Sequence, residues 1–371
     1  MRRTRKPSAG SETIGRPDDL EGWPAAEEST DWFGDAAAEQ TLLEAFHSGR
    51  IHHAWLICGP KGIGKATLAF RFARFVLAHP DPGAPEVAAA ADLSVDPQHP
   101  AFRRVAARAH PNLLVLQRAY NDDRKRFYTE LTVDEIRRTV AFFGSTAGEP
   151  GWRIAVVDPA DDLNPNAANA LLKNLEELPA RSLFLIVCHA PGRLLPTIRS
   201  RCRRLNVRPL TSQAIERALS ERLRDTAALD TGALQLATSL AEGSLRRAIH
   251  LTDGGGMEIY RDLARILENV PDIDVEAMHA LATRVAARDA DEVFDSFLDA
   301  LCGWLDRRVR GEEEPDDSLR LSPAVRRAPL ESWAQVWEKV RRSSTLAEAL
   351  NLDRKQAVLS ILMTLAHATR M

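Results

Sequence analysis

The residues of this sequence best suited to chemistry form a glycine-rich loop, GPKGIGKA, at positions 59–66. The loop matches the phosphate-binding pattern G-x-x-x-x-G-K-[ST] at every defined position except the last. Its glycines allow backbone amides to wrap phosphate oxygens, and the start of the following helix adds a positive field. These glycines are Gly59, Gly62 and Gly64. Lys65 can reach the outer phosphates, so the pattern predicts a site for a nucleotide.

The last position of the loop lacks the hydroxyl group that would bind magnesium. Ala66 stands where serine or threonine is needed, and Thr67 follows it. One step along a helix turns a side chain by about 100°, so Thr67 is poorly placed to supply the missing oxygen. Both residues belong to the predicted nucleotide site by position, but we expect no metal ligand from this turn.

A carboxylate follows the apolar run RIAVV at 153–157, and a proline follows the carboxylate. Asp158 has the position of a magnesium-binding aspartate at the end of a buried strand. Pro159 stands where most nucleotide hydrolases of this plan have a glutamate that orients the attacking water. The next predicted strand ends in Cys188 and His189, where a hydroxyl or amide side chain is usual. We therefore predict a site that binds ATP weakly and does not hydrolyse it.

Six arginines lie in the stretch RLLPTIRSRCRRLNVR at 193–208. We single out Arg201, in SRC, because in oligomeric ATPases an arginine of one subunit can stabilise charge on the γ-phosphoryl group in the neighbouring site. DNA phosphates are the competing ligand, and a solvated basic face is the preferred interpretation for the other five. Arg246, at the start of a later predicted helix, could reach back to a phosphate or be an exposed helix residue.

The segments that must position these residues alternate between strands and helices. The short apolar runs HHAWLICG, NLLVLQ, WRIAVVD and SLFLIVCH are separated by helical patterns, which is typical of a mainly parallel sheet covered on both faces. We assign this α/β nucleotide-binding domain to residues 31–209, with an insertion at 79–111. Residues 1–30 lack periodicity and are rich in Pro, Gly, Glu and Arg, so we predict a disordered tail.

Strand patterns stop beyond residue 209. Residues 210–255 predict a small helical lid domain that ends near the glycine triplet 254–256, and residues 257–371 predict an all-helical C-terminal domain. Within DEVFDSFLDALCGWLDRRV, six apolar residues fall on one face at helical spacing. They are Val293, Phe294, Phe297, Leu298, Leu301 and Leu305.

The composition restricts the class of protein. The 49 Lys+Arg and 52 Asp+Glu give a net charge of −3, which excludes a protein that coats nucleic acid through bulk charge. Four widely separated cysteines favour free thiols in a reducing compartment over a zinc site. No apolar run approaches the roughly 18 residues of a membrane span, and we expect a cytoplasmic location.

Four stretches carry a resemblance to a known family: HHAWLICGPKGIGKATLA, NPNAANALLKNLEELP, LLPTIRSRC and GSLRRA. Together they resemble the clamp-loader branch of the P-loop AAA+ proteins, and in particular the delta-prime family of bacterial DNA polymerase III subunits. The similarity covers residues 32–255 with specific motifs. The helical remainder fits, by class, the collar through which this family oligomerises.

The resemblance implies a hetero-pentameric ring in which gamma/tau motor subunits and a delta subunit accompany this chain and place a sliding clamp on primed DNA. It also implies a non-hydrolysing stator, an accessory subunit of the nucleotidyltransferase complex, which donates Arg201 as an arginine finger to a neighbouring motor subunit. Many relatives carry a four-cysteine zinc module, but residues 79–111 contain no cysteine. Since His79, His99 and His110 are no convincing replacement, we predict no zinc.

Two other functions remain open. One is an active clamp-loader motor ATPase of the gamma/tau type, against which Ala66 and Pro159 argue and which turnover by the isolated chain would reveal. The other is a stand-alone DNA-binding ATPase in repair, which predicts salt-dependent DNA binding by the chain alone.

Overall fold

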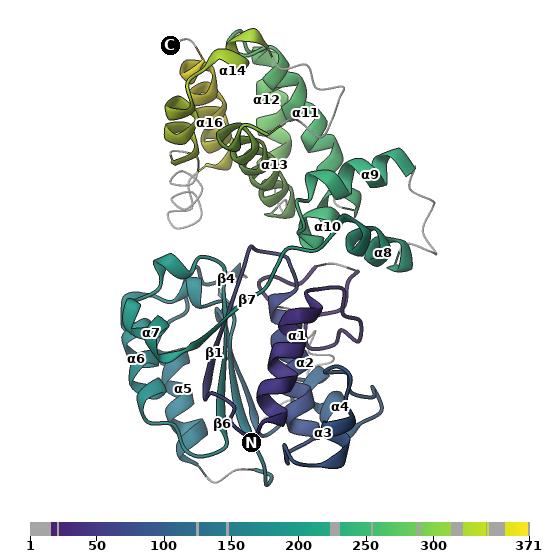
Figure 1. Cartoon of the computed structure of the whole chain (residues 1–371). Helices are drawn as coiled ribbons and strands as arrows, with labels where there is room; N and C mark the ends of the chain where they lie inside the picture. The colour runs from purple at the N-terminus through teal and green to yellow at the C-terminus, as the bar shows by residue number, and fades with distance from the viewer. Residues whose placement is uncertain are drawn as a thin grey trace, which may run out of the picture. The chain divides into compact units, whose positions relative to one another are not determined.

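A computed structural model of the chain describes residues 16–20, 22–123, 126–145, 148–222, 231–253, 255–287, 291–312, 322–338, 340 and 353–369 (Figure 1). Residues 1–15 and 21 of the predicted tail, and Gly254 of the glycine triplet that ends the predicted lid domain, lie outside this set. The chain divides into two compact units. One is built from residues up to Val207, and the other from residues 208–371 together with Phe33–Asp35 and Pro60–Gly64.

The first unit is built on a five-stranded parallel sheet with the strand order β2–β5–β6–β1–β7. The strands are β2 (Leu113–Leu116), β5 (Arg153–Val157), β6 (Ser182–Cys188), β1 (Ala54–Cys58) and β7 (Arg203–Asn206). Every residue of β1 and β6 is buried, as expected for central strands of a sheet that helices cover on both faces. The predicted α/β class is confirmed.

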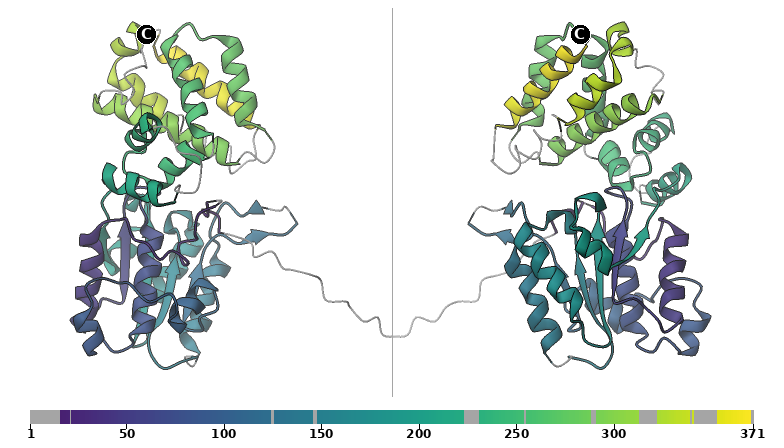
Figure 2. Two further views of the ribbon diagram at one scale, coloured as in Figure 1. Left: turned by 90° about the vertical axis from the view of Figure 1, so that its right-hand side faces the viewer. Right: turned by 60° about the vertical axis from the view of Figure 1, so that its left-hand side comes forward.

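Helices cover the two faces of this sheet in separate groups (Figures 1 and 2). One group holds α1 (Ala36–His47) and α2 (Lys65–Ala78), and the other holds α5 (Val133–Gly144), α6 (Pro165–Glu176) and α7 (Pro196–Arg201). Asn164 caps α6 by accepting a hydrogen bond from the Ala167 amide (2.9 Å), and Pro165 takes the first helical position. Because the strands are parallel, the residues that follow β1, β5 and β6 meet at one edge of the sheet.

The predicted insertion at 79–111 contains two short helices, α3 (Pro85–Ala89) and α4 (Pro100–Ala106). Helix α4 packs against α2, and Val87, Phe102 and Val105 are buried. Beyond β2, a two-stranded hairpin of β3 (Tyr120–Asn121) and β4 (Arg126–Phe127) extends from the first unit (Figure 2).

The described residues of the N-terminal stretch differ from the disordered tail that we predicted for residues 1–30. Arg16 and Glu27 are 7% and 1% exposed, and Arg74 of α2 donates hydrogen bonds to the carbonyl oxygens of Glu27 (3.2 Å) and Ser29 (2.7 Å). Residues 16–20 and 22–30 are part of the first unit, and a buried arginine of α2 binds the backbone of this stretch at Glu27 and Ser29.

The secondary structure described in the second unit after Arg208 is entirely helical. It consists of α8 (Ser212–Arg222), α9 (Thr231–Leu240), α10 (Leu245–Asp253), α11 (Gly256–Glu268), α12 (Val275–Val285), α13 (Asp291–Arg310), α14 (Pro323–Arg327) and α16 (Arg354–Ala368). On α13 the predicted apolar face is confirmed: Phe294, Phe297, Leu301 and Leu305 are buried in the main core, and Val293 and Leu298 pack against it. A smaller cluster, Ala237, Leu240, Leu251 and Tyr260, joins α9 and α10 to α11.

Candidate nucleotide site and arginine positions

The phosphate loop connects the buried end of β1 to the start of α2, as the sequence pattern requires. Gly59 follows β1 directly, and its amide donates to the Cys188 carbonyl oxygen (3.3 Å). Gly62 (φ 81°) and Gly64 (φ 86°) have left-handed backbone conformations, which residues with a side chain rarely adopt. A Cβ atom on Gly62 would lie 2.3 Å from Ser244 Oγ and 2.6 Å from Arg246 Cβ. Glycine is thus required at position 62 by both conformation and space.

Lys65 is the first residue of α2 and is 3% exposed. Burial lowers the pKa of Lys65 to about 8, and the nearby carboxylates of Asp161 and Asp158 act in the opposite direction. The ammonium group therefore belongs to a cluster with two carboxylates near the strand ends. Ala66 and Thr67 follow in the first turn of α2, half-buried, and Ala66 offers no side-chain oxygen.

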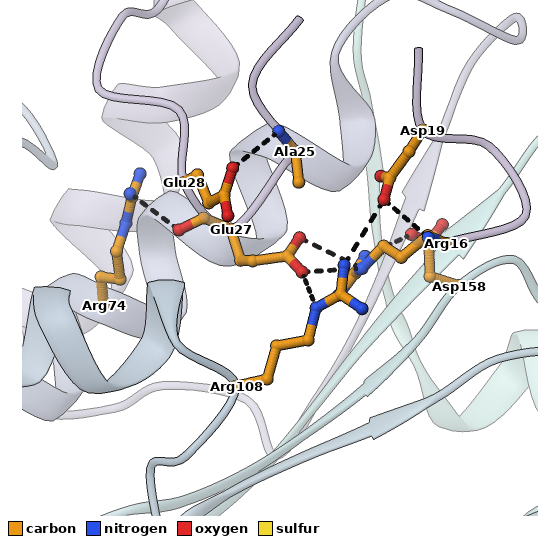
Figure 3. A network of polar contacts seen from close by, with 8 residues as sticks. All are labelled: Arg16, Asp19, Ala25, Glu27, Glu28, Arg74, Arg108 and Asp158. Carbon is orange, nitrogen blue, oxygen red and sulfur yellow. Dashed lines mark hydrogen bonds and ion pairs between the residues drawn. The ribbon is translucent and has the colours of Figure 1, made fainter. Parts of the chain in front are cut away.

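Asp158 follows β5 directly, at the predicted edge of the sheet. The Arg16 guanidinium donates a hydrogen bond from Nη1 to Asp158 Oδ2 (3.2 Å; Figure 3). The two side chains are 5% and 17% exposed. Burial raises the pKa of the Asp158 carboxyl to about 6, although Arg16 and Lys65 lower it. Asp158 is thus an ion-paired carboxylate inside the first unit.

The residues around Asp158 do not fit a magnesium site. Magnesium prefers oxygen ligands at near-octahedral positions, yet the Asp158 carboxylate already accepts from Arg16. Ala66 has no hydroxyl, and the Pro159 side chain offers neither an oxygen to bind a metal ion nor a base to orient water. Among the residues that the structure describes, no group of three or more His, Cys, Asp or Glu side chains could hold a metal ion.

Asp161 is a further site residue, absent from those predicted from the sequence. Its carboxylate accepts hydrogen bonds from the His189 amide (2.6 Å) and the Ala190 amide (2.7 Å). It thereby fixes the backbone that follows β6, where Cys188 is buried beside its register partner Cys58 on β1. The only hint in the sequence is that Asp161 belongs to the acidic run DPADD. Asp158 stands out in this run because it follows the strand directly, whereas nothing in the sequence distinguishes Asp161 from its neighbours.

Arg201 is the last residue of α7, and its side chain is 37% exposed. Its Nη2 lies 2.6 Å from Oε1 of Glu176, at the end of α6, and its Nη1 donates to the Thr197 carbonyl oxygen (3.1 Å). The guanidinium is therefore held at the surface by one exposed carboxylate and its own helix.

Other arginines of the same stretch make local contacts. Arg203 lies over the Trp55 ring (4.8 Å to its centroid), Arg204 donates from Nε to Asn206 Oδ1 (2.7 Å), and Arg208 pairs with Asp35 (2.9 Å). These contacts favour a structural role for these three arginines.

Arg246 lies near the start of α10, in the second unit. Its backbone amide donates a hydrogen bond to the Gly62 carbonyl oxygen (3.2 Å). The contact joins Arg246 to the phosphate loop through the backbone, whereas the sequence left two alternatives open for its side chain, a contact with phosphate and an exposed helix position.

Sequence comparison relates this chain to subunits of DNA polymerase III. A family described as "DNA polymerase III, delta subunit" matches residues 34–211. The delta-prime subunit of DNA polymerase III from Pseudomonas aeruginosa is 33% identical over 71% of this chain and 74% of its own length. The chain belongs to the delta-prime family of DNA polymerase III subunits. The resemblance to the delta-prime family, inferred from the loop, strand and SRC motifs, is thus confirmed by a relative matched over 74% of its own length.

Other relatives include both delta-prime and tau subunits. The delta-prime subunit of Escherichia coli is 29% identical over 62% of this chain and 63% of its own length. The tau subunit of Bacillus subtilis is 28% identical over 60% of this chain and 37% of its own length. A gamma subunit-related protein of Thermotoga maritima has a TM-score of 0.45 at 15% identity, covering 90% of this chain and 100% of its own.

None of the described helices is long and apolar enough to cross a membrane.

Proposed function

We propose that this chain is a clamp-loader subunit of DNA polymerase III that does not hydrolyse ATP itself and donates Arg201 to the site of a neighbouring motor subunit. It works in the cytoplasm, in a hetero-pentamer with gamma/tau and delta subunits that loads a sliding clamp on primed DNA. We assign residues 257–371 to the collar of that assembly, residues 210–255 to a lid, and residues 31–209 to the nucleotide domain.

The observation that carries the non-hydrolysing role is the pairing of Asp158 with Arg16 next to Pro159. A hydrolytic site needs a free carboxylate for metal and a group that orients water. Here the Asp158 carboxylate accepts a hydrogen bond from the Arg16 guanidinium, and the side chain of the next residue, Pro159, has no group that could orient water. The glycine loop and Lys65 are retained, so any ATP bound through residues 59–67, with Arg246 nearby, is expected to be held weakly and left intact.

The position of Arg201 supports its action in trans. The side chain stands at the end of a surface helix, and exchanging Glu176 for a phosphoryl group requires breaking only an exposed ion pair, which is worth little. An arginine finger raises the rate by a factor of about 10³–10⁵. This corresponds to far more free energy than Arg201 would lose by giving up its exposed ion pair with Glu176.

The test is DNA- and clamp-stimulated ATP turnover by a reconstituted loader containing this chain or its Arg201→Ala variant. We expect a loss of at least about tenfold per affected site, and no turnover by the isolated chain. Arg199→Ala is the matched control, because Arg199 is exposed on the same helix, and it should leave turnover within about twofold of the unchanged loader. If the loader with Arg201→Ala turned over ATP as fast as the unchanged loader, the proposed role of Arg201 as an arginine finger would be wrong.

An active motor ATPase of the gamma/tau type is the second candidate, favoured by the likeness to tau subunits and by the intact Lys65. It predicts steady-state turnover by the isolated chain that Lys65→Ala abolishes. The same measurement therefore separates the two functions.

A further inference from the structure

Arg16, in the N-terminal stretch of residues 16–20 and 22–30, supplies a cation to the carboxylate at which a divalent metal would be expected. Arg16 Nη1 lies 3.2 Å from Asp158 Oδ2. Arg16 comes from a part of the chain that the phosphate-loop pattern does not include, 142 positions before its partner. The pair is therefore a feature of the three-dimensional structure and not of the motif.

Arg16 is held in place by several contacts besides Asp158. Its Nε donates to Glu27 (3.1 Å), its backbone amide donates to Asp19 Oδ2 (2.6 Å), and its guanidinium lies over the Phe70 ring at 4.2 Å. These contacts, drawn in Figure 3 apart from the ring, orient the guanidinium toward the strand end. A desolvated guanidinium over an aromatic face is stabilised by the ring quadrupole.

The partners of Arg16 are themselves anchored to other parts of the first unit. Glu27, which is 1% exposed, also pairs with Arg108. Arg74 of α2 donates to the Glu27 carbonyl oxygen. Displacing Arg16 from Asp158 would therefore leave one buried charge unpaired or require rearranging this network, which is costly in a low-dielectric interior.

We propose that the Arg16 guanidinium takes the place of a divalent cation beside Asp158, so that this chain has no magnesium-dependent step in nucleotide binding. The ligand class that fits the loop is then a nucleoside di- or triphosphate without a bound metal. The proposal deepens the proposed non-hydrolysing role and rests on the same phosphate loop, but it does not involve Arg201.

Charge balance favours this assignment. A metal ion at Asp158 would lie close to the cations Arg16 and Lys65, with Ala66 contributing no ligand oxygen. Arg16 neutralises the carboxylate without needing further oxygen ligands, because a guanidinium brings its own donors in a fixed planar geometry.

The experiment measures the affinity of the isolated chain for ATP with excess Mg²⁺ and with EDTA, by titration calorimetry. For the unchanged chain we expect affinities within about twofold under the two conditions, or no binding under either. Arg16→Gln should gain binding that is at least about fivefold tighter with Mg²⁺, and a second change, Asp158→Asn, should abolish that gain. Arg104→Gln, which alters an exposed ion pair with Glu149, is the control and should behave like the unchanged chain.

Two results would overturn the proposal. One is Mg²⁺-dependent binding by the unchanged chain, and the other is a folded Arg16→Gln chain without any Mg²⁺ dependence. If Arg16→Gln does not fold, Asp158→Asn alone decides. It leaves Arg16 paired with Glu27, and it should leave ATP affinity unaltered with and without Mg²⁺, whereas a metal-binding Asp158 predicts a loss only with Mg²⁺. A negative result in this ATP titration would not change the result expected for Arg201→Ala in the loader assay. The proposal on Arg16 and the proposed function of Arg201 can therefore be refuted separately.

Discussion

At the scale of single residues, Asp158 links the stability of the first unit to pH. Its folded-state pKa of about 6 is above the ordinary value of 3.8, because burial outweighs Arg16 and Lys65, while Asp18 and Glu27 raise it further. A raised pKa means that the stabilising contribution is present below pH 3.8 and is lost as the pH rises through about 6. The ion pair with Arg16 limits this loss, since it exists only when the carboxyl is ionised.

Arg16→Gln should therefore destabilise the chain more at pH 8 than at pH 5, by about 1–3 kcal/mol in the free energy of unfolding. Denaturant unfolding at the two pH values checks this. Arg104→Gln, at an exposed pair, should cost under about 1 kcal/mol at both. If Arg16→Gln lowered the free energy of unfolding equally at both pH values, the ion pair between Arg16 and ionised Asp158 would not contribute to stability.

Gly62 provides a second prediction at this scale. Gly62→Ala places a methyl group against Ser244 and Arg246 at a left-handed backbone position, and should lower stability by about 2–4 kcal/mol and abolish nucleotide binding. Gly49→Ala is the matched control, because Gly49 has φ 65° but open space around it. It should cost only about 1 kcal/mol. Thermal melts of both variants separate the steric cost from the conformational cost.

Arg16 was missed by sequence reasoning for a physical reason. The loop glycines, Lys65 and Asp158 could be predicted because a motif fixes their positions relative to the strands. Arg16 could not, because its partner is distant in sequence and its own surroundings lack periodicity. A signal was nevertheless present: Arg71 and Arg74 interrupt the apolar helix KATLAFRFARFVLA, and buried arginines require acceptors from elsewhere in the chain.

At the scale of elements, α2 connects the phosphate loop to the N-terminal stretch. Arg71 pairs with Glu39 (2.6 Å) and donates to the Thr30 carbonyl oxygen (3.1 Å), while Arg74 binds the backbone at Glu27 and Ser29. Both arginines are buried. Residues 22–30 are thus fastened to the same helix that begins with Lys65.

Arg74→Gln should loosen this attachment without unfolding the sheet. We expect amide hydrogen exchange in residues 22–30 to become at least about tenfold faster, which corresponds to about 1.4 kcal/mol of local stability. Exchange in β1 and in α13 should stay unchanged. Uniform acceleration over the whole chain would show instead that Arg74 supports the global fold.

The elements themselves were largely predictable, and the exceptions have identifiable causes. Buried parallel strands are continuous apolar runs, so β1, β5 and β6 were evident from composition alone. The insertion at 79–111 was harder, because its helices are five and seven residues long, too short for helical periodicity to emerge. The contact between the predicted lid helices and α11 through Leu251 and Tyr260 also had no signature, because local sequence reveals apolar faces but not their partners.

At the scale of the whole molecule, the two compact units have separate main cores. Leu56 is 1% exposed in the core around the sheet, and Phe297 is fully buried in the core of the C-terminal helices. Each core can therefore be weakened by itself.

Leu56→Ala and Phe297→Ala should each cost about 2–5 kcal/mol, through lost burial and a residual cavity. By calorimetry we expect the two changes to shift different portions of the unfolding profile, with Phe297→Ala leaving ATP affinity unaltered. A single transition that both variants shift equally would contradict independent cores, since the units would then unfold together.

The paired positions of Cys58 on β1 and Cys188 on β6 give the chain a built-in reporter. Both thiols are buried, and they lie in register on neighbouring central strands, beside the phosphate loop and the Asp161 anchor. A thiol-alkylating reagent can reach them only when the middle of the sheet opens, whereas the partly exposed Cys302 serves as an internal standard. Their alkylation rates would time the opening of the nucleotide edge in the unmodified protein, without any introduced label.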